Sequence, residues 1–237
     1  MIAGFIITGN APKKVIVRGI GPSLAGIRDV LADPVLELHG ASGSLIMSND
    51  NWKETQQIDI QNSTLAPTND LESAIIAILP PAAYTVILRG KNETMGVGLV
   101  EMYDLDAGSD SKLANISTRG FVQTGNDVMI AGFILGNGSA SEKVVIRAIG
   151  PSLTGISNVL ADPMLDLYDG NGTLLLSNDN WKDDASQAAD ILASGIAPQN
   201  DFESAIVTSL PPGAYTAVVS GKDGGTGVAI AEVYHLR

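Results

Sequence analysis

The sequence contains no cysteine, which excludes disulfide bonds, thiolate catalysis and cysteine-bound zinc. Histidine is nearly absent as well. His39 and His235 are the only two, and neither lies in a nucleophile or zinc motif. No apolar run approaches the roughly 20 residues of a membrane-spanning helix. From these absences we expect a non-enzymatic protein without a membrane span.

Positive charge is also scarce. The 237 residues include 14 Lys and Arg against 26 Asp and Glu, so the formal net charge is −12. A chain this acidic is repelled by a phosphate backbone, and we therefore expect no nucleic-acid partner. Hydrophobic residues make up 45% of the chain, as in folded domains rather than disordered segments.

An internal duplication organises what is present. The opening Met1-Ile-Ala-Gly-Phe-Ile recurs from Met129, and Ser48-Asn-Asp-Asn-Trp52 recurs unchanged as residues 177–181. A pattern that repeats at domain length predicts a tandem array. We place the first domain at residues 1–106 and the second at residues 107–237, with the small polar segment Asp104–Ser111 as the linker.

Short strand patterns fill each copy, and no long helical period is present. In the first copy the expected strands are Ile2–Thr8, Val15–Val17, Val35–His39, Ser44–Met47, Glu72–Leu79, Ala83–Leu88 and Gly96–Tyr103. Gly9–Pro12 indicates that the first two form a hairpin. Gln56–Ile60 is compatible with a short helical turn or with a loop. The sequence predicts an all-β protein of two tandem, jelly-roll-like β-sandwiches.

One stretch, residues 113–128, occurs only once and precedes the second copy. We interpret it as a leader strand that the first copy lacks. A sandwich that is short of one strand has an open edge, and open edges accept strands from partners. We expect an open groove near Met1–Thr8 that pairs head to tail with another copy into a filament. The alternative is that the chain is one piece of a longer repeat protein. The predicted assembly residues are Met1, Ile2, Phe5, Ile7, Ile116 and Phe121.

The repeated Ser-Asn-Asp-Asn-Trp motif offers clustered oxygen atoms, which are the ligands that Ca²⁺ prefers. The alternative is that the Asn and Asp side chains only cap turns. On the first interpretation each copy binds one Ca²⁺. The candidate ligands are Asn49, Asp50, Asn51, Asp70 and Glu72 in the first copy and Asn178, Asp179, Asn180, Asp201 and Glu203 in the second.

Trp52 and Trp181 are the only tryptophans and occupy equivalent positions. Exposed rings would make a stacking platform for a polysaccharide, and the chain would then be a carbohydrate-binding module of a secreted protein. We favour the alternative, in which each ring is a buried anchor with its N–H bonded nearby. Arg18 and Arg147 precede glycine-rich turns, and we expect each to pair with a neighbouring acid, Asp33 or Asp162.

Two segments of the second copy carry a family resemblance. Leu165–Asp179 reads as a strand, a glycine turn, a strand and Asn-Asp, and Leu210–Gly221 as a Pro/Gly–Tyr strand. These segments, with Val35–Asp50 and Leu79–Gly90, resemble the bacterial pre-peptidase C-terminal domain and repeats of large secreted surface proteins. The resemblance implies a non-catalytic, extracellular or cell-surface structural repeat whose partners are further copies or neighbouring repeats. It assigns no catalytic residue and adds support for calcium.

Overall fold

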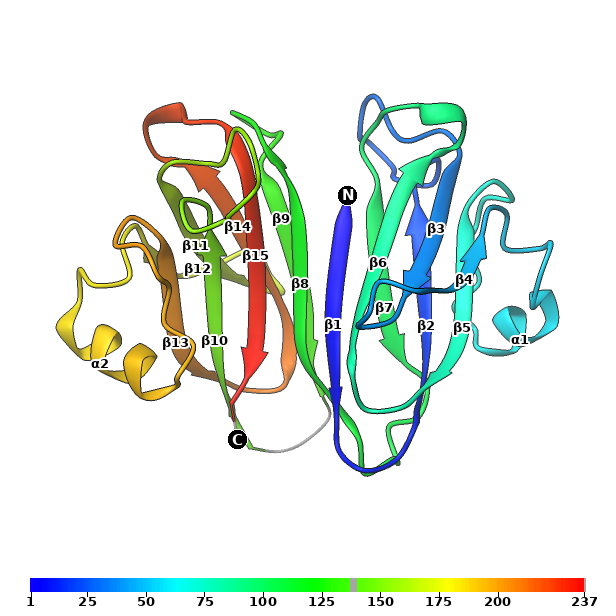
Figure 1. Ribbon diagram of the computed structural model, residues 1–237, viewed down its shortest axis with the longest axis horizontal. Helices are drawn as coiled ribbons and strands as arrows, with labels where there is room; N and C mark the ends of the chain where they lie inside the picture. The colour runs from blue at the N-terminus through cyan, green and yellow to red at the C-terminus, as the bar shows by residue number, and fades with distance from the viewer. Residues whose placement is uncertain (137–139, 237) are drawn as a thin grey trace. The chain divides into compact units, whose positions relative to one another are not determined.

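The computed structural model describes residues 1–136 and 140–236 (Figure 1). The chain divides into two compact units, Met1–Ala114 and Asn115–Arg237, which we call the first and the second unit. Nearly all regular structure is antiparallel β-sheet, and Figure 1 shows the strands of each unit stacked in two layers. The prediction of an all-β, sandwich-like fold is confirmed.

The first unit consists of two sheets and one short helix. The first sheet has the order β1 (Ile2–Thr8), β6 (Ala83–Gly90), β3 (Pro34–His39) and β4 (Leu45–Asn49). The second has the order β5 (Ser73–Leu79), β2 (Lys13–Ile20) and β7 (Leu99–Asp104). The helix α1 (Gln57–Asn62) lies between β4 and β5 in the chain, and a 3-10 turn at Lys91–Glu93 follows β6.

The second unit repeats this order with one further strand. One sheet contains β12 (Leu174–Asn178), β11 (Pro163–Asp169), β14 (Gly213–Gly221) and β9 (Met129–Leu135). The other contains β13 (Ser204–Leu210), β10 (Glu142–Ile149), β15 (Gly227–His235) and β8 (Lys112–Val122). The helix α2 (Ala185–Ala193) precedes β13, and a 3-10 turn at Lys222–Gly224 follows β14.

The expected hairpin between the first two strands is wrong. β1 pairs with β6, whereas β2 pairs with β5 and β7, so the two strands belong to different sheets. The connection turns the corner of the sandwich at Gly9, whose φ of 120° favours glycine. A side chain at Gly9 would also meet the Ser111 Oγ atom at 2.5 Å. Glycine and proline in the connection therefore mark a change of sheet rather than a hairpin.

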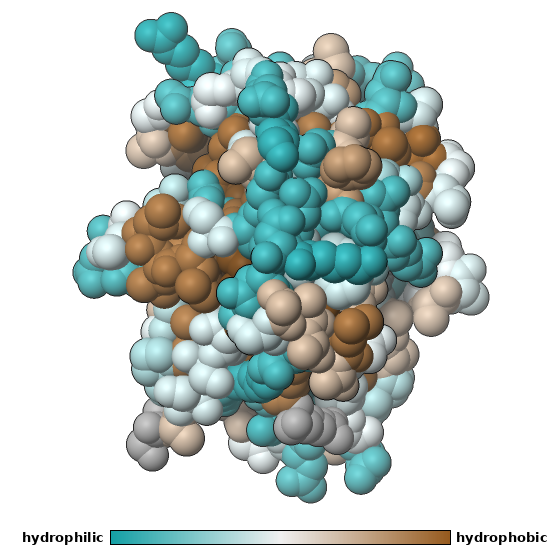
Figure 2. Space-filling model, turned by 90° about the vertical axis from the view of Figure 1, so that its left-hand side faces the viewer, coloured by the Kyte–Doolittle hydropathy of each residue, from teal (hydrophilic) through white to brown (hydrophobic). Residues whose placement is uncertain are grey.

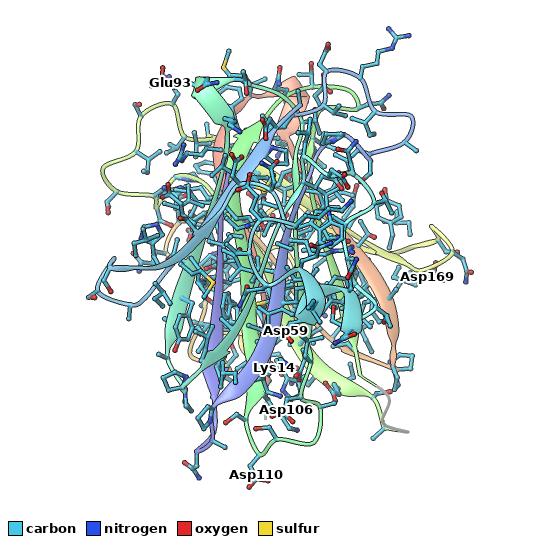
Figure 3. The ribbon with its side chains drawn as sticks, turned by 90° about the vertical axis from the view of Figure 1, so that its right-hand side faces the viewer. Lys14, Asp59, Glu93, Asp106, Asp110 and Asp169 are labelled. Atoms are coloured by element: carbon cyan, nitrogen blue, oxygen red, sulfur yellow. The ribbon has the colours of Figure 1, made fainter. Side chains whose placement is uncertain are left out.

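The segment predicted as a linker is bound to the first unit. Lys13, only 1% exposed, donates from Nζ to the Asp104 carboxylate at 2.7 Å and to the Asp106 carbonyl at 2.8 Å. The Ala11 N–H donates to Ser111 Oγ at 3.1 Å. Figure 3 shows Lys14, Asp106 and Asp110 towards the same end of this unit and Glu93 towards the opposite end. The compact units thus divide after Ala114 rather than after residue 106.

The core of the second unit lies between its two sheets. Its buried members come from both sheets, among them Phe133, Val144, Leu165, Ala217 and Val233. A smaller cluster includes Val145 of β10 and Val207 of β13, together with Trp181 and with Ile191 of α2. Successive side chains of a strand point to opposite faces of the sheet. Alternate side chains of β10 and β13 therefore lie in the main core and in the smaller cluster.

Candidate functional site

The leader segment forms β8, and β8 pairs with β15. The antiparallel register runs from Asn115 opposite Tyr234 to Val122 opposite Gly227. Val122 is fully buried, and Ile116 packs against the core of the second unit. The strand that follows the leader in the chain, β9, lies in the other sheet. Neighbours in sequence are therefore not neighbours in the sheet here.

The strand of the first unit that corresponds to β15 is β7. β7 pairs with β2 on one side, and its three-stranded sheet ends there among the residues that the structure describes. We call the other side of β7, from Val97 to Asp104, the β7 edge. The comparison of the two units therefore indicates that the strand which the first unit lacks would lie beside β7, and not beside Met1–Thr8 as expected. β1 pairs with β6 just as β9 pairs with β14, so this position in the sandwich is filled.

The predicted assembly residues lie in different environments. Phe5 and Ile7 are 3% and 2% exposed, and the Phe5 ring stacks on Tyr84 with centroids 5.2 Å apart. These two side chains are core residues and offer nothing to a partner. Met1 and Ile2 lie at the start of β1, where the Met1 amino group donates to the Leu88 carbonyl at 3.0 Å. The leader residues Ile116 and Phe121 alternate, with Ile116 towards the core and Phe121 55% exposed.

In each unit an arginine, a glutamate and a tyrosine, which we call the arginine clamp, join two neighbouring strands. These strands are β2 and β7 in the first unit and β10 and β15 in the second. Arg18 Nε donates to the Glu101 carboxylate at 2.9 Å, and its guanidinium lies 5.2 Å from the Tyr103 ring centroid. The Tyr103 hydroxyl donates to the same glutamate at 2.9 Å. In the second unit Arg147, Glu232 and Tyr234 form the same set. The expected pairing of the arginines with Asp33 and Asp162 is wrong, because the acid comes from the adjacent strand.

The predicted calcium ligands separate into different sites. Asn49 is 5% exposed, and its amide accepts from the Ala74 N–H at 2.9 Å and donates to the Asn51 carbonyl at 3.0 Å. Asp70 forms an exposed ion pair with Lys53 at 2.6 Å. The counterparts Asn178 and Asp201 behave alike, accepting from the Ala205 N–H and pairing with Lys182.

The glutamates of the predicted set are fully buried and serve a loop. Glu203 accepts from the Gly150 and Ser152 N–H groups at 3.1 and 2.9 Å and from the Asn200 N–H at 3.2 Å. Glu72 accepts from the equivalent donors of Gly21, Ser23 and Asn69. A carboxylate with three backbone donors is satisfied without a metal. Glu72 and Glu203 therefore hold the Gly-x-Gly-Pro-Ser and Ile-Gly-Pro-Ser turns rather than a cation.

Of the remaining candidates, Asp50 shares Lys91 with Asp33, an acid that the sequence suggests as a partner of Arg18 and not as a member of this set. Lys91 Nζ lies 2.6 Å from the Asp50 carboxylate and 3.6 Å from that of Asp33. The hydrogen bond to Asp50 is the main reason why the pKa of Lys91 is raised. In the described part of the chain, Oδ1 of Asp33, Asp50 and Asn51 is buried and accepts no hydrogen bond. The sequence Ala-Asp-Pro occurs at residues 32–34 and again at residues 161–163, and this repetition is the signal that could have pointed to Asp33.

The second unit contains the same arrangement. Lys222 Nζ lies 2.5 Å from Asp179 and 3.9 Å from Asp162. Burial, and next the charge of Asp179, raises the pKa of Asp162. Oδ1 of Asp162, Asp179 and Asn180 is again buried without a partner among the described residues. We call Asp33, Asp50, Asn51 and Lys91, with their counterparts, the Asp-Asn-Lys clusters. Within the described residues no group of three or more His, Cys, Asp and Glu side chains is placed to hold a metal ion.

Both tryptophans are buried anchors. Each ring is 4% exposed, and Nε1 donates at 3.1 Å to the carbonyl of Asn69 or Asn200. Lys53 and Lys182 lie over the rings, 5.3 and 4.9 Å from the centroids. A stacking platform at Trp52 and Trp181 is therefore contradicted, because neither ring face is open to a sugar.

The histidines contact glutamates rather than each other. His39 Nε2 lies 3.2 Å from Glu37, and His235 Nε2 lies 3.2 Å from Glu142. Arg89 also binds Glu37, and its hydrogen bond is the main reason why the pKa of that carboxyl is lowered.

In the described residues no helix is long and apolar enough to span a membrane.

The β7 edge differs from its counterpart in the second unit in the exposure of two apolar side chains, although exposed apolar side chains occur elsewhere as well. Leu45 and its counterpart Leu174 are 57% and 51% exposed, so this feature belongs to both units. On the side shown in Figure 2, hydrophobic surface gathers in separate areas beside a broad polar band. Val97 and Leu99 are 44% and 39% exposed, whereas their counterparts Val228 and Ile230 are half-buried.

Comparisons with known proteins give only distant structural similarity. No family model and no curated protein matches the chain. The chain is similar to the atomic structure of Sulfolobus turreted icosahedral virus, at 12% identity, a TM-score of 0.31 and coverage of 100% of this chain and 88% of that one. The major capsid protein P2 of bacteriophage PM2 aligns at 10% identity and a TM-score of 0.25, covering 100% and 93%. Similarity at this level says nothing about function.

Proposed function

We propose that this chain is a non-catalytic structural repeat module of the cell surface or extracellular space, which assembles by adding a strand at the β7 edge. The observation that carries the proposal is the contrast between β15, which is covered by β8, and β7, which has no described strand on the same side. An uncovered edge strand presents backbone donors and acceptors that a further strand satisfies.

Head-to-tail pairing between copies is the self-assembling form of this proposal. The donor strand β8 and the acceptor strand β7 are different surfaces, so their pairing is heterologous and extends into a filament. A β8 strand that moves to a neighbour leaves its own β15 uncovered. The number of covered edges stays the same, and we expect association that is weak and strongly dependent on concentration.

Sedimentation velocity over a wide concentration range, with electron microscopy of the same samples, tests the self-assembling form. Larger species and regular fibres at high concentration support it. The matched variant Val122→Asp, which removes the buried apolar end of β8, should abolish the larger species. Monodisperse particles at every concentration contradict self-assembly.

A second candidate function is cation binding at the Asp-Asn-Lys clusters. Its specific support is the set of buried oxygen atoms without partners, which recurs at equivalent atoms in both units. Ca²⁺ takes six to eight oxygen ligands, from carboxylates, amides and carbonyls. The ammonium group of Lys91 or Lys222 occupies the carboxylates and competes with such an ion. Calorimetric titration with CaCl₂ before and after chelation tests binding, and the absence of heat in wild type and in Lys222→Met contradicts it.

A further inference from the structure

We infer that the β7 edge is a binding site for a free strand of the β8 type: an extended, basic segment with apolar and small residues at alternate positions. The inference rests on the proposed strand addition and names the partner. The second unit supplies the template, because β8 and β15 show how such a strand binds.

The template defines which side chains of the strand face the core. Val122, Gly120, Thr118 and Ile116 lie opposite Gly227, Ala229, Ala231 and Val233. In β15, Ala229, Ala231 and Val233 are 0%, 1% and 6% exposed. Val122 and Ile116 therefore close the two ends of the inner face, with small side chains between them. A strand in this position completes the sandwich as well as the sheet.

β7 has the same features as β15, but its inner face is less covered. Residues 96–103, Gly-Val-Gly-Leu-Val-Glu-Met-Tyr, correspond to Gly-Val-Ala-Ile-Ala-Glu-Val-Tyr at residues 227–234. Glu101 and Tyr103 bind Arg18 just as their counterparts bind Arg147. The side chains of Val100 and Met102 are half-buried, whereas Ala231 and Val233 are buried. The first unit therefore has the acceptor surface without the strand.

Charge favours the same occupant. The strand β8 contains Lys112 and Arg119, and no acidic residue follows Lys112 before Asp127. The two acids of β7, Glu101 and Asp104, are already paired with Arg18 and Lys13, so the negative charge comes from the chain as a whole, whose net charge is −12. A basic strand is attracted to a chain of this net charge, and the attraction weakens as salt rises.

A count of donor strands and acceptor edges shows that a second intact copy cannot cover every edge. Among the residues that the structure describes, each copy supplies one β8 and two edges of this kind, β7 and β15, so an exchange of β8 between copies leaves one of these edges per copy uncovered. A strand that has no acceptor edge of its own gains the whole contact area. We therefore assign the β7 edge to such a free strand.

The decisive experiment adds the strand to the complete chain. Residues 113–128 are duplicated ahead of Met1, which reproduces their natural junction with Met-Ile-Ala-Gly-Phe. Linkage gives the added strand a high effective concentration at the edge. We expect slower hydrogen exchange at residues 99–104 and a higher melting temperature for the first unit. The matched control carries aspartate in place of the added copies of Ile116 and Val122 and should show neither change.

A second arm uses a labelled peptide of residues 112–124 and the unmodified chain. We expect saturable fluorescence anisotropy, weaker binding at high salt and loss of binding to the chain with the duplicated leader. If the duplicated leader neither protects residues 99–104 nor blocks the peptide, the inference is overturned. If the leader protects them but wild type forms no fibres, the binding site stands and self-assembly fails. If fibres form but neither arm shows binding at β7, assembly uses another surface.

Discussion

The two units differ at their borders and agree in their centres. Both contain the buried glutamate, the tryptophan anchor and the arginine clamp, with nearly identical distances. They differ where β8 covers β15 and at the start of the helix after the tryptophan. The shared contacts therefore specify the sandwich, and the differences determine how well an edge or a helix end is closed.

The helix difference comes from two extra residues in the second unit. Gln56 and Gln187 both accept from a backbone N–H of the adjacent strand, at Ile76 and Val207, at 3.0 Å. In the first unit Gln56 is itself the N-cap, in a left-handed conformation with φ of 56° and no side-chain cap bond. In the second unit Asp184 is the N-cap and accepts from the Ser186 and Gln187 N–H groups. The insertion adds a capped turn before an otherwise equivalent contact.

The largest effect should come from the matched anchor substitutions Trp52→Ala and Trp181→Ala. Each removes a ring that is 4% exposed and leaves a cavity, which costs about 3–5 kcal/mol in its own unit. Calorimetry should show one transition lowered in each variant and the other unchanged. A variant that keeps both transitions would show that the ring is not an anchor.

The next effect concerns the strand that only the second unit has. Val122→Ala should destabilise the second unit by about 2 kcal/mol, because Val122 is fully buried in its core. Trp52→Phe leaves Trp181 as the only indole, so fluorescence then reports the second unit alone. Phe121→Ala, at a 55% exposed neighbour, is the control and should change little. Equal losses of stability in Val122→Ala and Phe121→Ala would contradict the alternation of inward-facing and outward-facing side chains along β8.

A smaller effect is expected at the Asp-Asn-Lys clusters. Lys222→Met removes the ammonium group 2.5 Å from Asp179 and should raise calcium affinity several-fold over wild type. The control Lys222→Met with Asp179→Asn removes a ligand charge and should lose the gain. Calcium-dependent melting of the second unit is the measurement, and the unmodified first unit is the internal reference. An equal calcium response in all three proteins would exclude the cluster as a cation site.

Local structure could be predicted from the sequence where a side-chain pattern specifies it. The alternation in Val35–His39 and the apolar run before Pro80 gave β3 and β5 nearly to the residue. The burial of both tryptophans agrees with the alternative that the sequence favours over a stacking platform. The existence of the leader strand followed from its β-branched and aromatic residues.

The pairing of strands could not be predicted in the same way. β8 pairs with β15, more than 100 residues along the chain, and not with the sheet of the adjacent β9. The roles of Glu72 and Asp33 could not be predicted for the same reason. Their partners, Gly21 and Lys91, are about 50 residues away or more in the chain. Neighbouring residues of the repeated motif, such as Asn49 and Asp50, have different partners: Asn49 binds the Ala74 N–H, and Asp50 binds Lys91.

The smallest effect, at the helix cap, carries a pH signature that only the second unit should show. Hydrogen bonds, first of all from the Ser186 side chain, lower the pKa of Asp184 below its ordinary value of 3.8. The folded state therefore binds this proton less tightly than the unfolded chain. The resulting stability is present above that ordinary value and is lost as the pH falls through the lowered pKa.

Asp184→Ala should thus lower the melting temperature of the second unit by a few degrees at pH 7, and the difference from wild type should vanish in strong acid. Asp184→Asn keeps an acceptor oxygen without the charge and should lose less at pH 7 and show no acid dependence of its own. Gln56→Ala in the first unit removes a group that does not titrate. Any decrease in the melting temperature of that unit should therefore be the same at pH 7 and in strong acid. A difference between Asp184→Ala and wild type that persists unchanged below pH 3 would mean that the charged cap does not stabilise the helix.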